Sequence, residues 1–197
     1  MKQIEITTKV NMKLSDVDKL LNTQGFKKIR KSRIEDIYLS NHDGDLENDN
    51  ILDILKKSIL LRYLCVNNDK EYKKITYKNK NYKGNTVISE EKINVEIDDI
   101  SNAEKLFNIL GYKRLVEVKY DAIVYKKDNV ELCFQDVENM GLLLEYENPN
   151  DFEGISQNKI YDIKQKMLNE LKKYNLDITN DFDIKKAYEL IKNEIND

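Results

Sequence analysis

The sequence predicts an α+β fold in a single domain, and three observations lead to that prediction. Its 197 residues suffice for one domain with a sizeable core. Short runs rich in β-branched and aromatic residues fill the chain up to Pro149, the only proline. Beyond it, apolar residues recur at three- and four-residue spacing over 160–171 and 184–195. We therefore expect a β-rich domain over residues 1–148 and two packed helices within 149–197 that belong to the same domain.

Eight strands are expected before the proline, and helices separate some of them. A helix over 15–24 begins at a serine that can cap it and ends at Gly25, and a second over 101–110 repeats this pattern before Gly111. A third helix is expected near 46–57. The predicted strands span residues 2–10, 33–40, 59–66, 72–78, 87–97, 115–126, 129–136 and 141–147.

The two capped helices reveal an internal repeat. Leu20 and Gly25 recur as Leu106 and Gly111 at one constant offset, which continues into the following strand, whereas the preceding strand repeats at an offset one residue longer. The sequence therefore predicts a sheet built from two similar halves.

Charged residues gather on one face of several strands. Because side chains alternate, Ile4 and Ile6 can pack on a helix while Glu5, Thr7 and Lys9 share the opposite face. If the sheet closes on itself with its helices outside, these faces point into a polar interior, which is costly unless it binds something charged. The other such faces are Lys74, Thr76 and Lys78; Lys92, Asn94 and Glu96; and Glu145 with Glu147.

Composition excludes several classes of protein. Lys+Arg 33 against Asp+Glu 36 gives a net charge of −3, which is too balanced for binding to a nucleic-acid backbone or an anionic membrane. The run Ile59–Leu61 is far shorter than the ~18 apolar residues of a membrane span, and no signal peptide is visible, so a cytoplasmic location is expected. Cys65 and Cys133 lack metal-site spacing and are expected to be buried free thiols. A single histidine in a polar loop argues against a serine or cysteine nucleophile with a histidine base.

Several short motifs follow one another in an order typical of a known family. The opening Ile4–Lys9 is similar to an ExExK signature, and Val130–Gly141 with Glu145-Tyr146-Glu147 is similar to a closing hairpin that carries an E-x-E strand. In these motifs the sequence resembles the CYTH, or triphosphate tunnel metalloenzyme, superfamily. Further similar segments are Leu61–Leu64 (L-R-I-R), Ile75–Lys78 (L-T-Y-K), Val95–Asp99 before its helix, and Lys186–Leu190, which resembles the S-Y-x-x-L tail of the cyclase-like branch.

The resemblance implies an eight-stranded antiparallel closed β-tunnel with outer helices and a C-terminal helical pair, which binds a triphosphate and uses Mg²⁺ or Mn²⁺. It implies that the metal ligands are Glu5, Glu145, Glu147 and Glu96. It implies catalytic, phosphate-binding roles for Lys9, Arg62 and Lys78, with Lys92 and Lys119 as further phosphate ligands. These residue types suit the chemistry, because phosphoryl and nucleotidyl transfer need cations at the oxygens and carboxylates around a hard metal.

The sequence also departs from the family pattern. Thr7, Leu64, Gln135 and Ala122 stand where a glutamate, an arginine, an aspartate and a basic residue are expected. Arg62 lies among leucines, so either a phosphate or a structural carboxylate must meet it, and we favour the phosphate.

Three functions follow from this pattern. The leading expectation is metal-dependent hydrolysis or cyclisation of ATP, thiamine triphosphate or inorganic tripolyphosphate. The second is a weak or inactive tunnel that binds a polyphosphate or nucleotide, and the third is a structural domain with nothing in its tunnel. Dimers occur among relatives, so a homodimer is included in the expectation.

Overall fold

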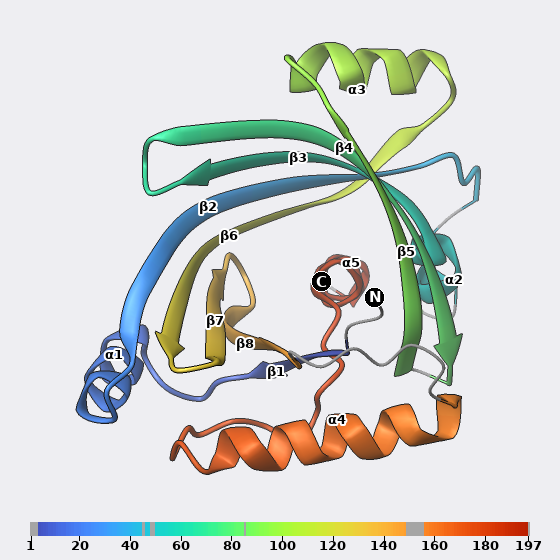
Figure 1. Cartoon of the computed structure of the whole chain (residues 1–197). Coiled ribbons are helices and arrows are strands. Elements are labelled where there is room, and N and C mark those ends of the chain that lie inside the picture. Colours follow the sequence, from blue (N-terminus) through green and yellow to red (C-terminus); the bar gives the residue numbers. More distant parts are fainter. Residues whose placement is uncertain (1–3, 45, 48–49, 85, 149–155, 197) are drawn as a thin grey trace.

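The computed structural model of the chain describes residues 4–44, 46–47, 50–84, 86–148 and 156–196 (Figure 1). All eight predicted strands are present, and β2 and β4 are longer than expected. Pro149 and the first residues of the 2–10 strand lie outside the described residues. The strands are β1 (Glu5–Lys9), β2 (Lys27–Ser40), β3 (Lys57–Val66), β4 (Lys70–Lys83), β5 (Thr86–Glu96), β6 (Lys113–Lys127), β7 (Val130–Val137) and β8 (Gly141–Glu147). The helices are α1 (Leu14–Thr23), α2 (Ile51–Lys56), α3 (Ile100–Ile109), α4 (Gln157–Lys172) and α5 (Lys186–Asn196).

The strands form one curled sheet in the order β1-β8-β7-β6-β2-β3-β4-β5, and every pairing is antiparallel. This confirms the predicted α+β class and the eight-stranded antiparallel sheet. Within the described ranges the edge strands β1 and β5 do not pair with each other, so the sheet itself is a half-barrel and other segments complete the tunnel.

Other parts of the chain occupy the seam between the two edge strands. The segment that precedes α5 runs along the free edge of β1, where Thr7 N–H donates to the Phe182 carbonyl at 2.9 Å and Thr179 N–H donates to the Lys9 carbonyl at 3.0 Å. Helix α4 lies across the opening and contacts both β1 and β5 (Figure 1). The edge groups of β1 are therefore satisfied without a barrel-closing strand pair.

The structure confirms the two similar halves. β1–α1–β2 and β5–α3–β6 have the same order, α1 and α3 each have 10 residues, and β2 pairs with β6 at the centre of the sheet. Gly25 and Gly111 follow the two helices with φ of 85° and 87°, a left-handed conformation that glycine adopts without strain.

The predicted serine caps are wrong. Helix α1 begins one residue before Ser15 and has no side-chain cap. In α3 the cap is Asp99, whose carboxylate accepts the backbone N–H of Asn102 at 2.7 Å, so Ser101 lies inside the first turn. The third predicted helix is present but short, as α2.

The described residues form three hydrophobic cores; the smallest packs α3 against β2 and β3, and the two larger ones lie on opposite faces of the sheet. On the convex face α1 and α4 pack against β1, β7 and β8, with Ile6, Leu144 and Leu168 almost fully buried. On the concave face α2 and α5 pack against β2 and β6, with Ala187 and Ile191 of α5 buried there.

Helix α5 therefore lies inside the curl while α4 lies outside it (Figure 1). Both expected C-terminal helices are present, and they enter different cores of the fold. Cys65 and Cys133 are free thiols, as predicted, but each is only partly buried. None of the described helices combines the length and apolar character needed to cross a membrane.

Candidate functional site

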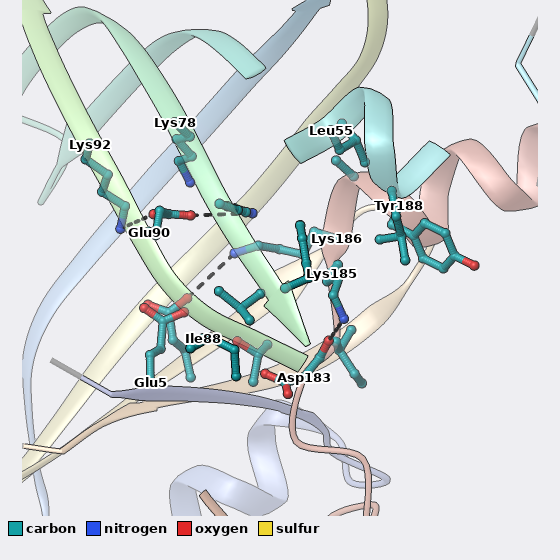
Figure 2. A pocket seen from close by; sticks show the side chains of 18 of the residues that line it. Glu5, Leu55, Lys78, Ile88, Glu90, Lys92, Asp183, Lys185, Lys186 and Tyr188 are labelled. Atoms are coloured by element: carbon teal, nitrogen blue, oxygen red, sulfur yellow. Dashed lines mark hydrogen bonds and ion pairs between the residues drawn. The ribbon is translucent and has the colours of Figure 1, made fainter. Parts of the chain in front are cut away.

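The concave side of the sheet encloses a hollow of about 650 Å³. The curl brings β1 and β8 opposite β4 and β5, so both ends of the sheet line the hollow, together with central strands, α2 and the C-terminal part of the chain. Figure 2 shows Glu5, Glu90 and Lys92 on one side of the hollow, with Lys186 reaching in from α5. The ionisable residues that line it are Glu5, Asp36, Arg62, Lys78, Lys80, Tyr82, Glu90, Lys92, Tyr120, Glu145, Glu147, Lys164, Asp183, Lys185, Lys186, Tyr38 and Tyr188.

Three glutamates form the acidic side of this hollow. Glu5 of β1 lies opposite Glu147 of β8, and Glu145 is two residues back along β8 on the same face. Glu5 keeps solvent access through the open hollow, but the surrounding protein desolvates it and the charge of Glu145 repels it, which raises the pKa of Glu5 to about 7. Burial and the charge of Glu145 also raise the pKa of Glu147. A cation would therefore stabilise this cluster.

A side-chain network holds Glu145 in place. Gln135 Nε2 donates to Glu145 Oε2 at 2.9 Å, and Lys186 Nζ donates to Gln135 Oε1 at 2.6 Å. Lys186 Nζ also lies 3.8 Å from Glu145 Oε2 and 4.4 Å from the centroid of the Tyr120 ring. Lys186 reaches this position because α5 lies inside the curl, and its only sequence signal is the motif at 186–190.

Lysines form the basic side of the hollow, and Lys78 differs from Lys80 and Lys92 in its ion pairing. Glu90 pairs with Lys92 at 2.9 Å and with Lys80 at 3.5 Å, whereas Lys78 has no ion pair to a described residue. Desolvation, opposed by Glu90 and reinforced by nearby cations such as Lys80, lowers the pKa of Lys78 to about 8. Lys78 is therefore the cation of the hollow that an anionic ligand would stabilise most.

The side chain of Arg62 already has a carboxylate partner within the protein. Its Nε and Nη2 atoms donate to the two carboxylate oxygens of Asp36 at 2.5 Å each, and Asp36 is only 2 % exposed. Burial lowers the pKa of Arg62, but the hydrogen bonds and charge of Asp36 outweigh it and raise the pKa. Of the two expected partners, the structure shows the carboxylate, and the phosphate that we favoured stays a prediction. The guanidinium has five N–H donors, so two bonds leave donors for a further ligand.

Six of the nine predicted site residues line the hollow, and three do not. Lys119 lies on the convex face, because Val118 and Tyr120 on either side of it point inward, and its ammonium pairs with Glu117 at 3.0 Å. Lys9 and Glu96 share a strand face with residues that line the hollow, but both are exposed and neither lines it. The residues brought together are Glu5, Arg62, Lys78, Lys92, Glu145 and Glu147.

The acidic side suits a hard divalent cation in its donor type but does not form a complete cage. Its oxygen donors are the kind that Mg²⁺ and Mn²⁺ prefer. Across the described residues, however, no group of three or more potential ligands converges closely enough to hold a metal. Mg²⁺ commonly uses one or two carboxylates together with water and substrate phosphates, and one or two of Glu5, Glu145 and Glu147 can fill that role.

Fold and site together define a duplicated, curled antiparallel sheet around an ionic hollow. The family model for the CYTH domain matches residues 1–182, a range that runs across Pro149. The chain belongs to the CYTH domain family.

Individual relatives cover nearly the whole chain. A protein of Methanocaldococcus jannaschii named "Putative adenylate cyclase" is 32% identical over 193 residues, which span 94% of this chain and 95% of that protein. A solved structure from Pyrococcus horikoshii is similar with a TM-score of 0.71 and 20% identity, covering 98% of this chain and 99% of that one. A second, from Hippeastrum, has a TM-score of 0.63 and 12% identity, with 98% and 96% covered; that protein is described as a "putative adenylyl cyclase" with a dominant triphosphatase activity. At these identities the two structures support the fold alone.

Proposed function

We propose that this protein binds a triphosphate-containing substrate in the hollow and, with Mg²⁺ or Mn²⁺, hydrolyses or cyclises it. The observation that carries the proposal is the arrangement of charge in one cavity: Lys78, with no carboxylate partner among the described residues, faces a cluster of glutamates across the curl. A triphosphate–metal complex is the common ligand that satisfies both sides. ATP, thiamine triphosphate and inorganic tripolyphosphate are the candidate substrates.

The named relatives support a triphosphate substrate. The protein from M. jannaschii is named a "putative adenylate cyclase", and the one from Hippeastrum is named a "putative adenylyl cyclase" and described as having a dominant triphosphatase activity. Both activities act at a triphosphate, so the site of this chain is expected to share that substrate class. The proposal includes a cytoplasmic location, where free thiols such as Cys65 stay reduced.

Each side of the hollow would have its own role. Lys78 and Lys92 would donate hydrogen bonds to phosphate oxygens, with Lys92 held in place by Glu90, and Arg62 would use the donors that Asp36 leaves over. Glu5, Glu145 and Glu147 would hold the metal. When bound, the metal neutralises phosphate charge and orients the attacking oxygen.

A second candidate function is binding without turnover. Thr7 stands where the family pattern has a glutamate, and Lys186 lies against Glu145, so part of the acidic cluster already has a cation. Both observations favour weak metal binding. In that case the hollow would retain a polyphosphate or a nucleotide without converting it.

Two assays separate these functions. Phosphate release and cyclic AMP formation are measured on the three candidate substrates with Mg²⁺ and with Mn²⁺, for the wild type and for Glu147→Gln, and binding of tripolyphosphate is measured by calorimetry. Metal-dependent turnover that the variant loses supports the enzyme, and binding without turnover supports the second function. If the protein neither binds nor converts any of these compounds, both proposed functions are refuted.

The homodimer expected from the family stays a prediction. Sedimentation of the purified chain would test it.

A further inference from the structure

A second cavity of about 340 Å³ lies beside the hollow, and we call it the side pocket. It is lined by α2, α4, the segment before α5 and the first turn of α5. Lys185 and Tyr188 line both cavities, so the two adjoin. Figure 2 shows Tyr188 on the side of the hollow away from Glu5 and Lys92. A ligand whose phosphates occupy the hollow could therefore extend past Lys185 into the side pocket.

Three aromatic side chains form part of the wall of the side pocket, beside polar and charged residues. Tyr161 of α4 and Phe182 meet edge to face, with ring centroids 5.3 Å apart at 66°, and Tyr188 of α5 contributes a third ring. Phe182 is 7% exposed, whereas Tyr161 is 53% exposed although it packs on that buried ring. An exposed ring held by a buried one provides a surface on which a flat heterocycle can stack.

The charge of the side pocket differs from that of the basic side of the hollow. Asp181 and Glu189 line the side pocket but not the hollow, and Lys185 at the boundary is its one lysine among the described residues. Lys185 Nζ donates to the Asp183 carbonyl at 2.8 Å, so it is held near the junction. Carboxylates disfavour phosphate and favour groups with N–H donors or positive charge. The two cavities thus match the two ends of a triphosphate ester.

We propose that the side pocket is a subsite for the organic group of the substrate, an aromatic heterocycle that carries N–H donors or a positive charge. The inference rests on the proposed function, since it assumes that the hollow holds the phosphates. Inorganic tripolyphosphate has no organic group and would occupy the hollow alone. The proposal therefore assigns this protein to triphosphate esters and not to tripolyphosphate.

The test compares ligands with and without the organic group. Calorimetry on the full chain, without divalent metal so that no turnover occurs, measures the affinity for ATP, thiamine triphosphate and tripolyphosphate. The variants are Tyr161→Ala and Tyr188→Ala. The matched control is Tyr72→Ala, which removes a tyrosine that is 47% exposed and lines neither cavity.

We expect the wild type to bind at least one ester more tightly than tripolyphosphate. Each side-pocket variant should weaken the ester by about tenfold and tripolyphosphate by less than about twofold, because one stacking contact is lost. Tyr161→Ala carries the test if Tyr188→Ala fails to fold, since Tyr161 is exposed. Asp181→Asn separates the two heterocycles: it should weaken thiamine triphosphate, whose thiazolium ring carries a permanent positive charge, more than ATP.

Two results would overturn the inference. If tripolyphosphate binds but the esters bind no more tightly and the tyrosine variants change nothing, the hollow is a polyphosphate site and the side pocket has no ligand. If no triphosphate binds to the wild type, the proposed function itself fails, and the inference fails with it.

Discussion

Single ionisable side chains control what the hollow can bind, and Lys78 is the clearest case. Desolvation lowers its pKa to about 8, so near neutral pH it carries a charge that is poorly compensated by protein groups. A phosphate oxygen would supply the missing partner. The lowered pKa therefore predicts how binding depends on pH.

We predict that the affinity for tripolyphosphate falls as the pH rises through 8. The free protein loses the Lys78 proton above its pKa of about 8, whereas bound phosphate favours the ammonium form, so binding must take up a proton in that range. The limiting fall is about tenfold per pH unit for one proton. Calorimetry from one unit below to one unit above that pKa measures it.

Lys78→Arg is the matched variant for this effect. A guanidinium stays charged over the whole range, so this variant should lose the pH dependence that Lys78 causes while it still binds. An unchanged profile in Lys78→Arg would assign the titration to another group.

The buried pair of Asp36 and Arg62 leads to a prediction about the stability of the protein. Asp36→Asn removes the negative charge and leaves Arg62, whose side chain is 23% exposed, without its counter-ion. Loss of one partner of a buried pair costs about 3 kcal/mol. Urea unfolding should show this loss, and the double variant Asp36→Leu/Arg62→Met should recover much of it, since no charge remains unpaired. Equal losses in the single and double variants would contradict the buried-pair interpretation.

The equivalent glycines that follow α1 and α3 allow a test of whether the two halves of the sheet are equivalent. Gly25 and Gly111 have nearly the same positive φ, and an added Cβ would meet nothing closer than 4.0 Å at either. Gly25→Ala and Gly111→Ala should therefore each cost only the backbone strain of an L-residue there, about 1–2 kcal/mol. Thermal or urea unfolding measures the loss, and two clearly unequal losses would argue against equivalent halves.

The N-cap of α3 allows a second test at a helix end. Asp99→Ala should destabilise the protein by about 1 kcal/mol, because it removes the bond to the Asn102 N–H. Ser101→Ala, one position into the first turn, should change stability by less than about 0.5 kcal/mol. If urea unfolding instead showed a larger loss of stability for Ser101→Ala than for Asp99→Ala, the serine would be the cap, as the sequence suggested.

The elements were largely predictable from the sequence, because local signals define them. Alternating residues mark the strands, and the glycines after α1 and α3 mark the helix ends. The same alternation, applied to β6, would have placed Lys119 outside, since Val118 and Tyr120 are the apolar residues on either side of it. The prediction for Lys119 failed because this lysine was chosen as the nearest basic substitute for missing motif residues, without regard to its strand face.

What could not be predicted is how distant segments combine in the whole molecule. The apolar face of α5 shows that the helix is buried, but it does not show that the burial is inside the curl. Lys186 could therefore be quoted as part of a motif but not placed beside Glu145. Asp36 was missed as the partner of Arg62 for the same reason: β2 and β3 are adjacent only once their register is fixed.

The segment before α5 gives the whole molecule its final form, and one ion pair ties it to α4. Lys164 of α4 has only 5% of its side chain exposed and pairs with Asp183, beside the point where this segment bonds to β1. Because α5 follows directly, the pair also fixes Lys186 inside the hollow.

We predict that Lys164→Met loosens this segment before the rest of the protein unfolds. The substitution removes a buried counter-ion of Asp183, at a cost of about 3 kcal/mol. Hydrogen exchange should then speed up at the Thr7, Thr179 and Ile184 amides, which bond across this edge, and not at the β2–β6 amides. Lys166→Met, which changes an exposed lysine on the same helix, is the control. Tripolyphosphate affinity should fall in parallel, because α5 carries Lys186 away from the carboxylates. Uniform faster exchange over the sheet would instead mean that the pair stabilises the whole fold and does not specifically hold α5 in the hollow.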